Sequence, residues 1–332
     1  MIKVAVTGAG AVLGQGIIKS LKMAPCKYDV LALDPNPLSP GLYWADSHHL
    51  IPMANDPRYG GAIETLLEAE RPDAVLVGTD VELAIFSRNK DIWETRFGTK
   101  IVVSSPDIVA IADDKMATAQ WLEAQRLPFP HSATGEASDD IDTLVAAHGF
   151  PLIVKPRQGA RSIGVSLVHS REDLAVALHG REGLIVQQWA GPDHEEYTAG
   201  VICFDGEVSA SIVLRRDLRD GNTFRAYAAD YPDCDAYVRQ VASALQPYGP
   251  ANFQFRRGTD GEFRLFEINA RFSGTTPMRA LLGFNEVHMV LQKVLLGKAI
   301  EQPSITRGTV VRFLEEQLLP PEVCAETGGA AQ

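Results

Sequence analysis

The stretch FPLIVKPRQGARSIGVSLV, residues 150–168, is the most informative segment of the sequence. Its apolar beginning predicts a strand that delivers Lys155, and its apolar end predicts a second strand that returns beside the first. The loop between them contains Gly159, Ser162 and Gly164, and its backbone N–H groups can bind a polyphosphate. We expect Lys155 to be exposed there and to supply a positive charge. Taken alone, the segment is equally compatible with an ordinary glycine turn.

A second hairpin is predicted by ANFQFRRGTDGEFRLFEINARFSG, residues 251–274. The Asp-Gly pair in its middle is typical of a tight turn between antiparallel strands. Such a hairpin brings Gln254 beside Glu267, and the two-residue repeat of a strand puts Asn269 and Arg271 on the same face. Carboxylate and amide oxygens suit Mg²⁺, and an arginine there can hold an anion through two hydrogen bonds. On these residues alone, the polar outer face of a hairpin remains the alternative.

Residues 1–105 alternate apolar strands with amphipathic segments, which predicts a parallel sheet covered by helices on both faces. The opening MIKVAVTGAGAVLGQG places Gly8, Gly10 and Gly14 after the first strand, and Asp34 ends the second. This is the arrangement of a dinucleotide-binding turn with its ribose-binding carboxylate. The spacing is one residue longer than the usual fingerprint. NAD(P) binding and a turn used only for packing therefore both stay open.

Lys115, the glycine hairpin and the oxygen-ligand hairpin follow one another in the order found in the ATP-grasp superfamily. The sequence resembles that superfamily over nearly its whole length, and most closely its carbamoyl-phosphate-synthetase-like carboxylate–amine ligases. The resemblance implies that ATP and Mg²⁺, or Mn²⁺, are cofactors. Lys115 and Lys155 then match the two lysines that hold the ATP phosphates. Gln254, Glu267 and Asn269 match the metal ligands.

The same resemblance extends to catalysis and to the nucleotide contacts. Arg271 matches the arginine that steadies the transferred phosphoryl group, so Lys155 and Arg271 are the expected catalytic residues. Residues 157–164 match a flexible lid loop, and LIVQQWAGPDHEEYTAGV matches the segment that binds adenine and ribose. The expected nucleotide contacts in these two segments are Arg157, Gly159, Ser162, Gly164, Gln187, Trp189, Ala190 and Glu196.

The expected fold class is α/β, with a Rossmann-like parallel-sheet domain followed by a two-part α+β ATP-grasp domain. Residues 1–105 form the first domain, 106–190 the lid subdomain with the phosphate hairpin, and 191–332 the C-terminal subdomain with the metal site. In ATP-grasp proteins the sheet before the ATP site carries a glycine turn without using NAD, and it helps to bind the substrate. The opening glycines are therefore expected to serve packing or the substrate rim.

Composition argues against several classes of partner. The net charge is −11, which disfavours nucleic acid or an anionic membrane as the main partner. No apolar run is long enough to cross a bilayer and the start is not of the signal type, so we expect a cytoplasmic protein. Cys26, Cys203, Cys234 and Cys324 have no spacing that suits zinc or a redox dithiol.

The expected activity is that of a ligase. ATP phosphorylates a substrate carboxylate, and an amine, or alternatively a thiol, attacks the acyl phosphate. The expected substrates are small-molecule or amino-acid-like: one supplies a carboxylate and the other an amine. A homodimer is an allowed assembly. Two alternatives stay open: an ATP-grasp kinase that phosphorylates a small molecule, and an NAD(P)-binding or regulatory module with a degenerate ATP site.

The sequence does not identify the substrates, but a few residues are candidates for contacting them. Glu82 follows the third strand of the parallel sheet, where ligands bind, although a helix-capping carboxylate is an equal alternative. Arg215, Arg216 and Arg225 lie in a stretch that can clamp a carboxylate or, more simply, form a solvated surface strand. Ser273, just after the metal hairpin, is a further candidate.

Overall fold

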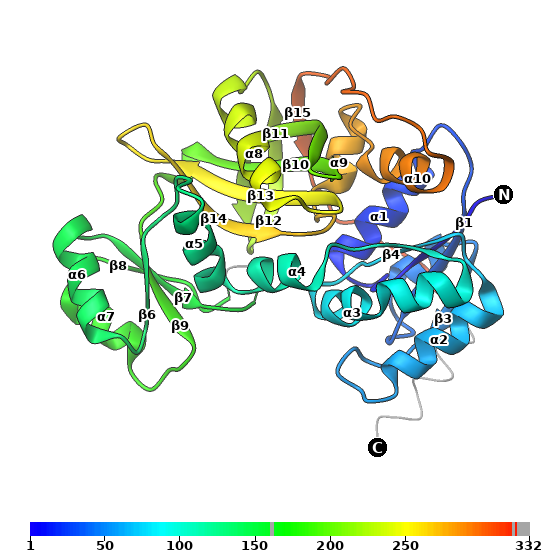
Figure 1. The fold of residues 1–332 in the computed structure, drawn as a ribbon, viewed down its shortest axis with the longest axis horizontal. Helices are drawn as coiled ribbons and strands as arrows, with labels where there is room; N and C mark the ends of the chain where they lie inside the picture. The colour runs from blue at the N-terminus through cyan, green and yellow to red at the C-terminus, as the bar shows by residue number, and fades with distance from the viewer. Residues whose placement is uncertain (160–162, 321–322, 324–332) are drawn as a thin grey trace.

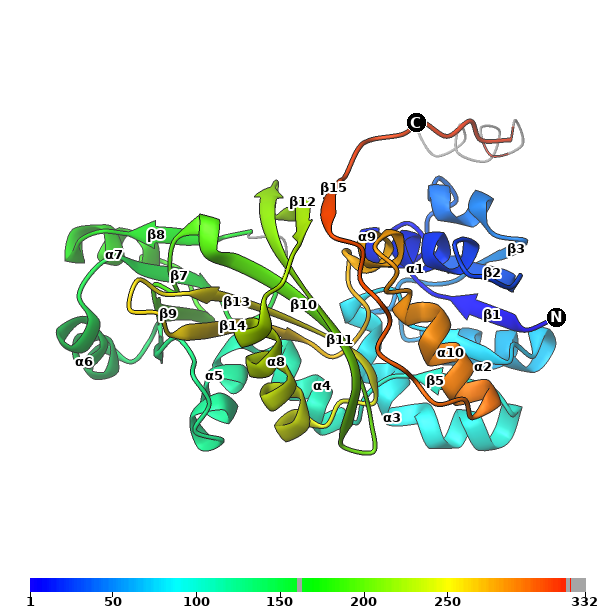
Figure 2. The same cartoon turned by 90° about the horizontal axis from the view of Figure 1, so that it is seen from above.

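The chain folds around three β-sheets (Figure 1). The computed structural model describes residues 1–159, 163–320 and 323. A parallel sheet lies at one end, a small antiparallel sheet lies at the other, and a six-stranded antiparallel sheet lies between them (Figure 2). The expected α/β class, with a parallel sheet first and antiparallel sheets after it, is confirmed.

The first sheet has five parallel strands in the order β3-β2-β1-β4-β5. The strands are β1 (Lys3–Val6), β2 (Asp29–Asp34), β3 (Ser47–Leu50), β4 (Ala74–Leu76) and β5 (Lys100–Val102). The helices of this part are α1 (Val12–Lys22), η1 (Pro40–Trp44), α2 (Tyr59–Glu70) and α3 (Asp80–Phe97). Since all five strands run in the same direction, the segments that follow β1, β2 and β4 meet at one rim of the sheet.

The small sheet carries the predicted glycine hairpin. Its four strands lie in the order β6-β9-β7-β8, all antiparallel. Leu152 on β7 pairs with Val168 on β8, so the predicted return of the chain is confirmed. The elements are β6 (Ser132–Thr134), α6 (Ser138–His148), β7 (Leu152–Pro156), β8 (Ser166–Val168), α7 (Arg171–Leu178) and β9 (Leu184–Gln188).

The central sheet has the order β14-β13-β10-β11-β12-β15. Its strands are β10 (Glu196–Phe204), β11 (Glu207–Arg219), β12 (Asn222–Ala228), β13 (Gly249–Arg257), β14 (Phe263–Asn269) and β15 (Gly308–Val311). The helices around it are α4 (Pro106–Asp113), α5 (Lys115–Ala124), η2 (Asp193–Glu195), α8 (Pro232–Leu245), α9 (Thr276–Leu281) and α10 (Glu286–Leu296). Gln254 on β13 lies opposite Glu267 on β14, which confirms the predicted second hairpin and its register.

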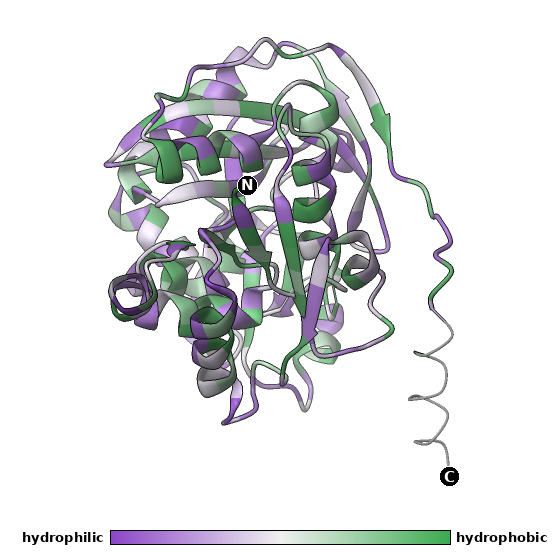
Figure 3. Ribbon diagram, turned by 90° about the vertical axis from the view of Figure 1, so that its right-hand side faces the viewer, coloured by the Kyte–Doolittle hydropathy of each residue, from purple (hydrophilic) through white to green (hydrophobic). Residues whose placement is uncertain are grey.

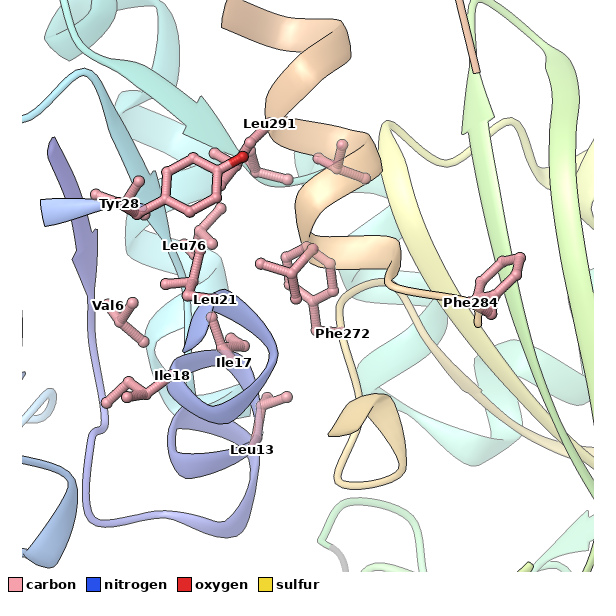
Figure 4. Close-up of a cluster of buried hydrophobic side chains, with 14 of the residues drawn as sticks. Val6, Leu13, Ile17, Ile18, Leu21, Tyr28, Leu76, Phe272, Phe284 and Leu291 are labelled. Carbon is pink, nitrogen blue, oxygen red and sulfur yellow. The ribbon is translucent and has the colours of Figure 1, made fainter. Parts of the chain in front are cut away.

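The parallel sheet and the central part share one hydrophobic core. Ile17 of α1, Phe272 after β14 and Leu291 of α10 are fully buried in the same cluster (Figure 4). Leu122 of α5 belongs to a second cluster with the residues of β10 and β13, so the helix before the small sheet packs on the central sheet. The parallel, small and central sheets lie within the predicted ranges 1–105, 106–190 and 191–332, respectively. The exact domain boundaries stay predictions.

Residues 312–320, which follow β15, leave the central sheet (Figure 3), and Gln317 Oε1 accepts a hydrogen bond from Trp44 Nε1 of η1 (3.0 Å). Phe313, Leu314 and Leu318 in this segment are exposed. Within the part of the chain that the structure describes, no helix combines the length and the apolar character needed to cross a membrane.

Candidate active site

Two adjoining cavities lie where the three sheets approach one another. The smaller, of about 180 Å³, lies between the small and central sheets, and its walls include Lys155, Trp189 and Phe266. The larger, of about 1080 Å³, lies between the central sheet and the rim of the parallel sheet. Seven residues line both cavities and define their junction: Lys115, Gln158, Gly159, Arg216, Gly221, Gln254 and Glu267.

Lys155 lies on β7 in the interior of the small sheet, and only 6% of it is exposed. Its Nζ donates a hydrogen bond to Gln187 Oε1 on β9 (2.7 Å) and lies 5.4 Å from the ring centroid of Phe266. Burial lowers the pKa of Lys155 to about 7; the nearby Lys115 also lowers it, and Glu267 opposes both effects. The expectation of an exposed lysine is wrong, because strands pair on both edges of β7 and the central sheet closes over it.

The structure brings most of the expected nucleotide contacts together and leaves others apart. The side chain of Arg157 turns toward α5 and forms an ion pair with Asp114, the N-cap residue of that helix (Nη2–Oδ2 2.6 Å). Gly164 lies beside Arg181 and does not line the smaller cavity. Ser162 lies outside the described residues. The role of each residue in nucleotide binding stays a prediction. The expected contacts that do line the smaller cavity are Lys115, Lys155, Gly159, Gln187, Trp189, Ala190 and Glu196.

Glu196 begins β10 and holds two arginines at the floor of the smaller cavity. Its Oε1 accepts from Arg216 Nε (2.9 Å) and Nη2 (2.7 Å), and its Oε2 accepts from Arg256 Nε (2.8 Å). All three residues line the cavity, and Glu196 is 3% exposed. Both carboxylate oxygens are therefore already paired, so a ribose would have to share them. Arg256 was missed from the sequence, although the two-residue repeat from Gln254 places it on the same face.

The predicted metal ligands form one hydrogen-bonded group at the junction. Glu267 Oε1 accepts from Gln254 Nε2 and from Asn269 Nδ2, both at 3.0 Å. Arg216 Nη2 donates to Gln254 Oε1 (2.6 Å), which joins this group to Glu196. One carboxylate and two amide oxygens fit Mg²⁺, a hard cation that completes its shell with substrate phosphates and water. No group of three or more His, Cys, Asp or Glu suited to a metal occurs among the described residues.

Arg271 connects the end of β14 to the parallel sheet. Its Nε and Nη2 donate to the two carboxylate oxygens of Asp80 at the start of α3 (2.6 and 2.7 Å), and Nη2 also donates to Asn269 Oδ1 (2.8 Å). The guanidinium thus lies beside the metal ligands and lines the larger cavity. Asp80 was not selected from the sequence, yet its place as the first residue of the helix after β4 is the signal that could have found it.

Glu82 is buried and lines neither cavity, contrary to its expected place at the substrate rim. Its side chain points into the protein and accepts from Thr7 Oγ1 (2.7 Å), Thr79 Oγ1 (2.6 Å) and the Tyr59 hydroxyl. Burial raises the pKa of Glu82, and the three hydroxyl donors act in the opposite direction. Glu82 is two residues along α3 from Asp80, so its side chain points in another direction and faces away from the cavity.

The arginines of β11 and β12 divide according to the two faces of the sheet. Arg215 packs over the Tyr227 ring (4.0 Å) and pairs with Asp217, and the exposed Arg225 lies 3.7 Å from the same carboxylate. Neither lines the two cavities, so the structure does not bring these two arginines to the site, and their role in substrate binding stays a prediction. Arg216 has the opposite orientation because successive side chains alternate, and it lines both cavities.

Ser273, the remaining expected substrate contact, lines the larger cavity beside Thr275. Its Oγ lies 2.6 Å from Thr275 Oγ1, and both side chains are buried. A role in substrate binding stays a prediction.

The opening glycine turn packs tightly against its own sheet. A Cβ on Gly14 would lie 2.1 Å from the carbonyl oxygen of Gly8, so only glycine fits where α1 crosses the turn. The Asp34 carboxylate accepts from Gly10 N (2.7 Å) and Ser39 Oγ (2.6 Å) and is 5% exposed. The carboxylate that would hold a ribose is therefore committed to the fold of the turn.

Three family descriptions match different parts of the chain. Residues 184–317 match "ATP-grasp in the biosynthetic pathway with Ter operon". Residues 116–247 match "D-ala D-ala ligase C-terminus", and residues 4–102 match "PylC-like, N-terminal domain". The first two together span the small and central sheets, including both predicted hairpins.

Individual relatives are similar over different lengths. The chain is 31% identical to the D-alanine–D-alanine ligase of Ectopseudomonas mendocina over 48% of its own length and 56% of that protein. It is 22% identical to the carbamoyl phosphate synthase large chain of Archaeoglobus fulgidus over 90% of its own length and 29% of that protein. The chain thus spans about half, or less, of the length of these curated relatives.

The fold has a close counterpart among solved structures. N5-carboxyaminoimidazole synthetase of Staphylococcus aureus, solved with ADP, superposes with a TM-score of 0.72 at 15% identity, over 92% of this chain and 80% of that one. At this identity the similarity concerns the fold.

Proposed function

From its membership of the ATP-grasp superfamily, we propose that this chain is an ATP- and Mg²⁺-dependent ligase that joins a small-molecule carboxylate to an amine. The reaction passes through an acyl phosphate: a carboxylate oxygen attacks the γ-phosphorus of ATP and ADP leaves. The amine then attacks the acyl carbon, inorganic phosphate departs with that oxygen, and an amide remains.

One observation carries the proposal: the smaller cavity meets the larger one at Lys115, Gln254 and Glu267. A nucleotide held in the smaller cavity, with its phosphates toward this junction, presents its terminal phosphoryl group to a carboxylate in the larger cavity. Holding the two reactants in line in this way accounts for much of the rate acceleration of an enzymatic phosphoryl transfer.

The residues at the junction supply charge where the reaction needs it. Lys115 and Lys155 approach the phosphates from the small-sheet side, and a bound polyphosphate favours the charged form of Lys155. Arg271 faces the junction from the end of β14, where it can stabilise charge on the transferred group. A Mg²⁺ held by Gln254, Glu267 and Asn269 would neutralise charge on the phosphate oxygens.

The test is ADP release on a panel of amino acids and small carboxylates, with and without amines, followed by mass spectrometry of the products. We expect ADP release that requires Mg²⁺ or Mn²⁺ and yields amide in equal amount. Glu267→Gln should abolish it, whereas Glu262→Gln, at the exposed tip of the same hairpin, should not. Phosphorylated acceptor without amide would replace the ligase by a kinase, and the absence of ATP turnover across the panel would contradict the proposal.

Three further points belong to the same proposal: the substrates are small molecules, the protein is cytoplasmic, and a homodimer is an allowed assembly. Light scattering of the purified protein measures the assembly and distinguishes a monomer from a homodimer.

A further inference from the structure

The larger cavity contains arginines of two kinds. Arg216 and Arg271 each have a carboxylate partner, Glu196 and Asp80 respectively. Arg312, which follows β15, lines the same cavity, and no carboxylate among the described residues forms an ion pair with it. The positive charge of Arg312 is therefore not neutralised by the described part of the protein.

Arg312 is held in place by both its backbone and its side chain. Its backbone N–H donates to the carbonyl oxygen of Phe224 on β12 (2.8 Å), which extends the pairing of β15 with β12. Its Nη2 donates to the carbonyl oxygen of Gly274. A Cβ built on Gly274 would lie 3.9 and 4.0 Å from the two Nη atoms of Arg312, and 3.1 Å from Val12 Cγ1. The guanidinium thus lies against the loop after β14, at the point where that loop also approaches the start of α1.

The surroundings of Arg312 make its charge costly. The residue is partly buried, and burial lowers the pKa of its guanidinium. The Gly274 carbonyl takes one of the five N–H donors of the side chain. A cation removed from water is destabilising unless an anion pairs with it. Arg88 shows the contrast, because it lines the same cavity but is exposed, and water can solvate it.

We propose that Arg312 binds a substrate carboxylate that does not react: the second carboxylate of a dicarboxylic acid, or the carboxylate of an amino acid that supplies the attacking amine. The planar fork of a guanidinium matches a carboxylate through two hydrogen bonds. The reacting group would lie at the junction near Glu267, and Arg312 would fix the other end of the molecule. This inference rests on the proposed function for the identity of the reacting group, but binding at Arg312 does not require turnover.

The test is binding without ATP, measured by calorimetry on the whole chain. The probes are pairs that differ by one carboxylate: L-alanine with ethylamine, L-lysine with cadaverine, and succinate with propionate. In at least one pair, the compound with the additional carboxylate should bind the wild-type protein at least tenfold more tightly than the compound without it. Arg312→Gln should remove that difference, and Arg312→Lys, which keeps the charge, should restore part of it. Arg307→Gln, on the other flank of β15 and paired with Asp230 at the surface, is the matched control and should bind as wild type does.

Two results would overturn the inference. One is that no pair shows a carboxylate-dependent difference in wild type, and the other is that Arg312→Gln keeps the difference. Catalysis is read separately as the KM and kcat of ADP release, where Arg312→Gln should raise the KM for the carboxylate compound and leave the KM for ATP unchanged. Carboxylate binding that depends on Arg312 in a protein that releases no ADP would contradict the ligase and uphold the inference.

Discussion

Replacement of Lys155 by methionine should make the protein more stable and less active. Lys155 is 6% exposed, and burial lowers its pKa from 10.5 to about 7. A fall of that size corresponds to a cost of about 5 kcal/mol for burying the charged amine. Methionine fills a similar volume without the charge, but it removes the hydrogen bond to Gln187 Oε1, which costs about 1–3 kcal/mol. We expect a net stabilisation of about 2–4 kcal/mol at pH 6.

The dependence on pH has a definite sign. Below pH 7 the Lys155 amine is protonated in both the folded and the unfolded protein, so the full burial penalty is present. Between pH 7 and 10.5 the unfolded chain holds the proton and the folded protein does not, so wild-type stability rises with pH through this window. The advantage of Lys155→Met over wild type should therefore be largest at pH 6 and smaller at pH 9.

The assay is urea unfolding of wild type, Lys155→Met and Lys22→Met at pH 6 and pH 9, with turnover measured on the same preparations. Lys22 is exposed on α1, so its replacement should change neither stability nor turnover appreciably. Lys155→Met should lose about 100-fold or more in turnover, as when one electrostatic donor to a transition state is removed. A variant that is no more stable than wild type at pH 6, or that keeps near-normal turnover, would refute the reasoning.

Other parts of the site yield further expectations. Excess chelator should stop ADP release, and Glu267→Gln should do the same while shifting the melting temperature by no more than a few degrees; turnover in chelator would contradict the metal assignment. Glu196→Gln leaves Arg216 and Arg256 without their shared carboxylate, so it should destabilise the protein by about 3–5 kcal/mol in urea unfolding, and a change below 1 kcal/mol would show that the charges find other partners. NAD(H) and NADP(H) should show no saturable binding in calorimetry at micromolar concentration, because the Asp34 carboxylate is committed to Gly10 and Ser39; tight binding would revive an NAD(P)-dependent function.

Local patterns were sufficient for the two hairpins. The two-residue repeat and the Asp-Gly turn correctly predicted that Gln254, Glu267 and Asn269 come together, because adjacent strands fix their mutual distances. The same two-residue repeat, applied to β11, predicts that the side chains of Arg215 and Arg216 lie on opposite faces of the sheet. These contacts depend on the nearest strands alone, and sequence patterns describe nearest strands well.

Features that depend on packing between sheets were not predictable in this way. The burial of Lys155 arises from the central sheet that closes over β7, and no pattern within residues 150–168 records that contact. Glu82 and Asp80 are both acidic residues at a helix start, and only the position of the core decides which one faces the cavity. Arg312 directly follows a strand that joins the edge of the central sheet from far along the chain, so its position beside Gly274 is a consequence of topology.

The claim that a carboxylate is activated as an acyl phosphate at the Lys155 and Glu267 junction is tested most directly by isotope transfer. The acid that supports ADP release is supplied with ¹⁸O in its carboxylate, together with its amine, and the released phosphate is analysed by mass spectrometry. The account predicts one ¹⁸O atom in each phosphate, since the oxygen that attacks the γ-phosphorus departs with it. Phosphate free of label, from a reaction that still forms amide, would contradict it.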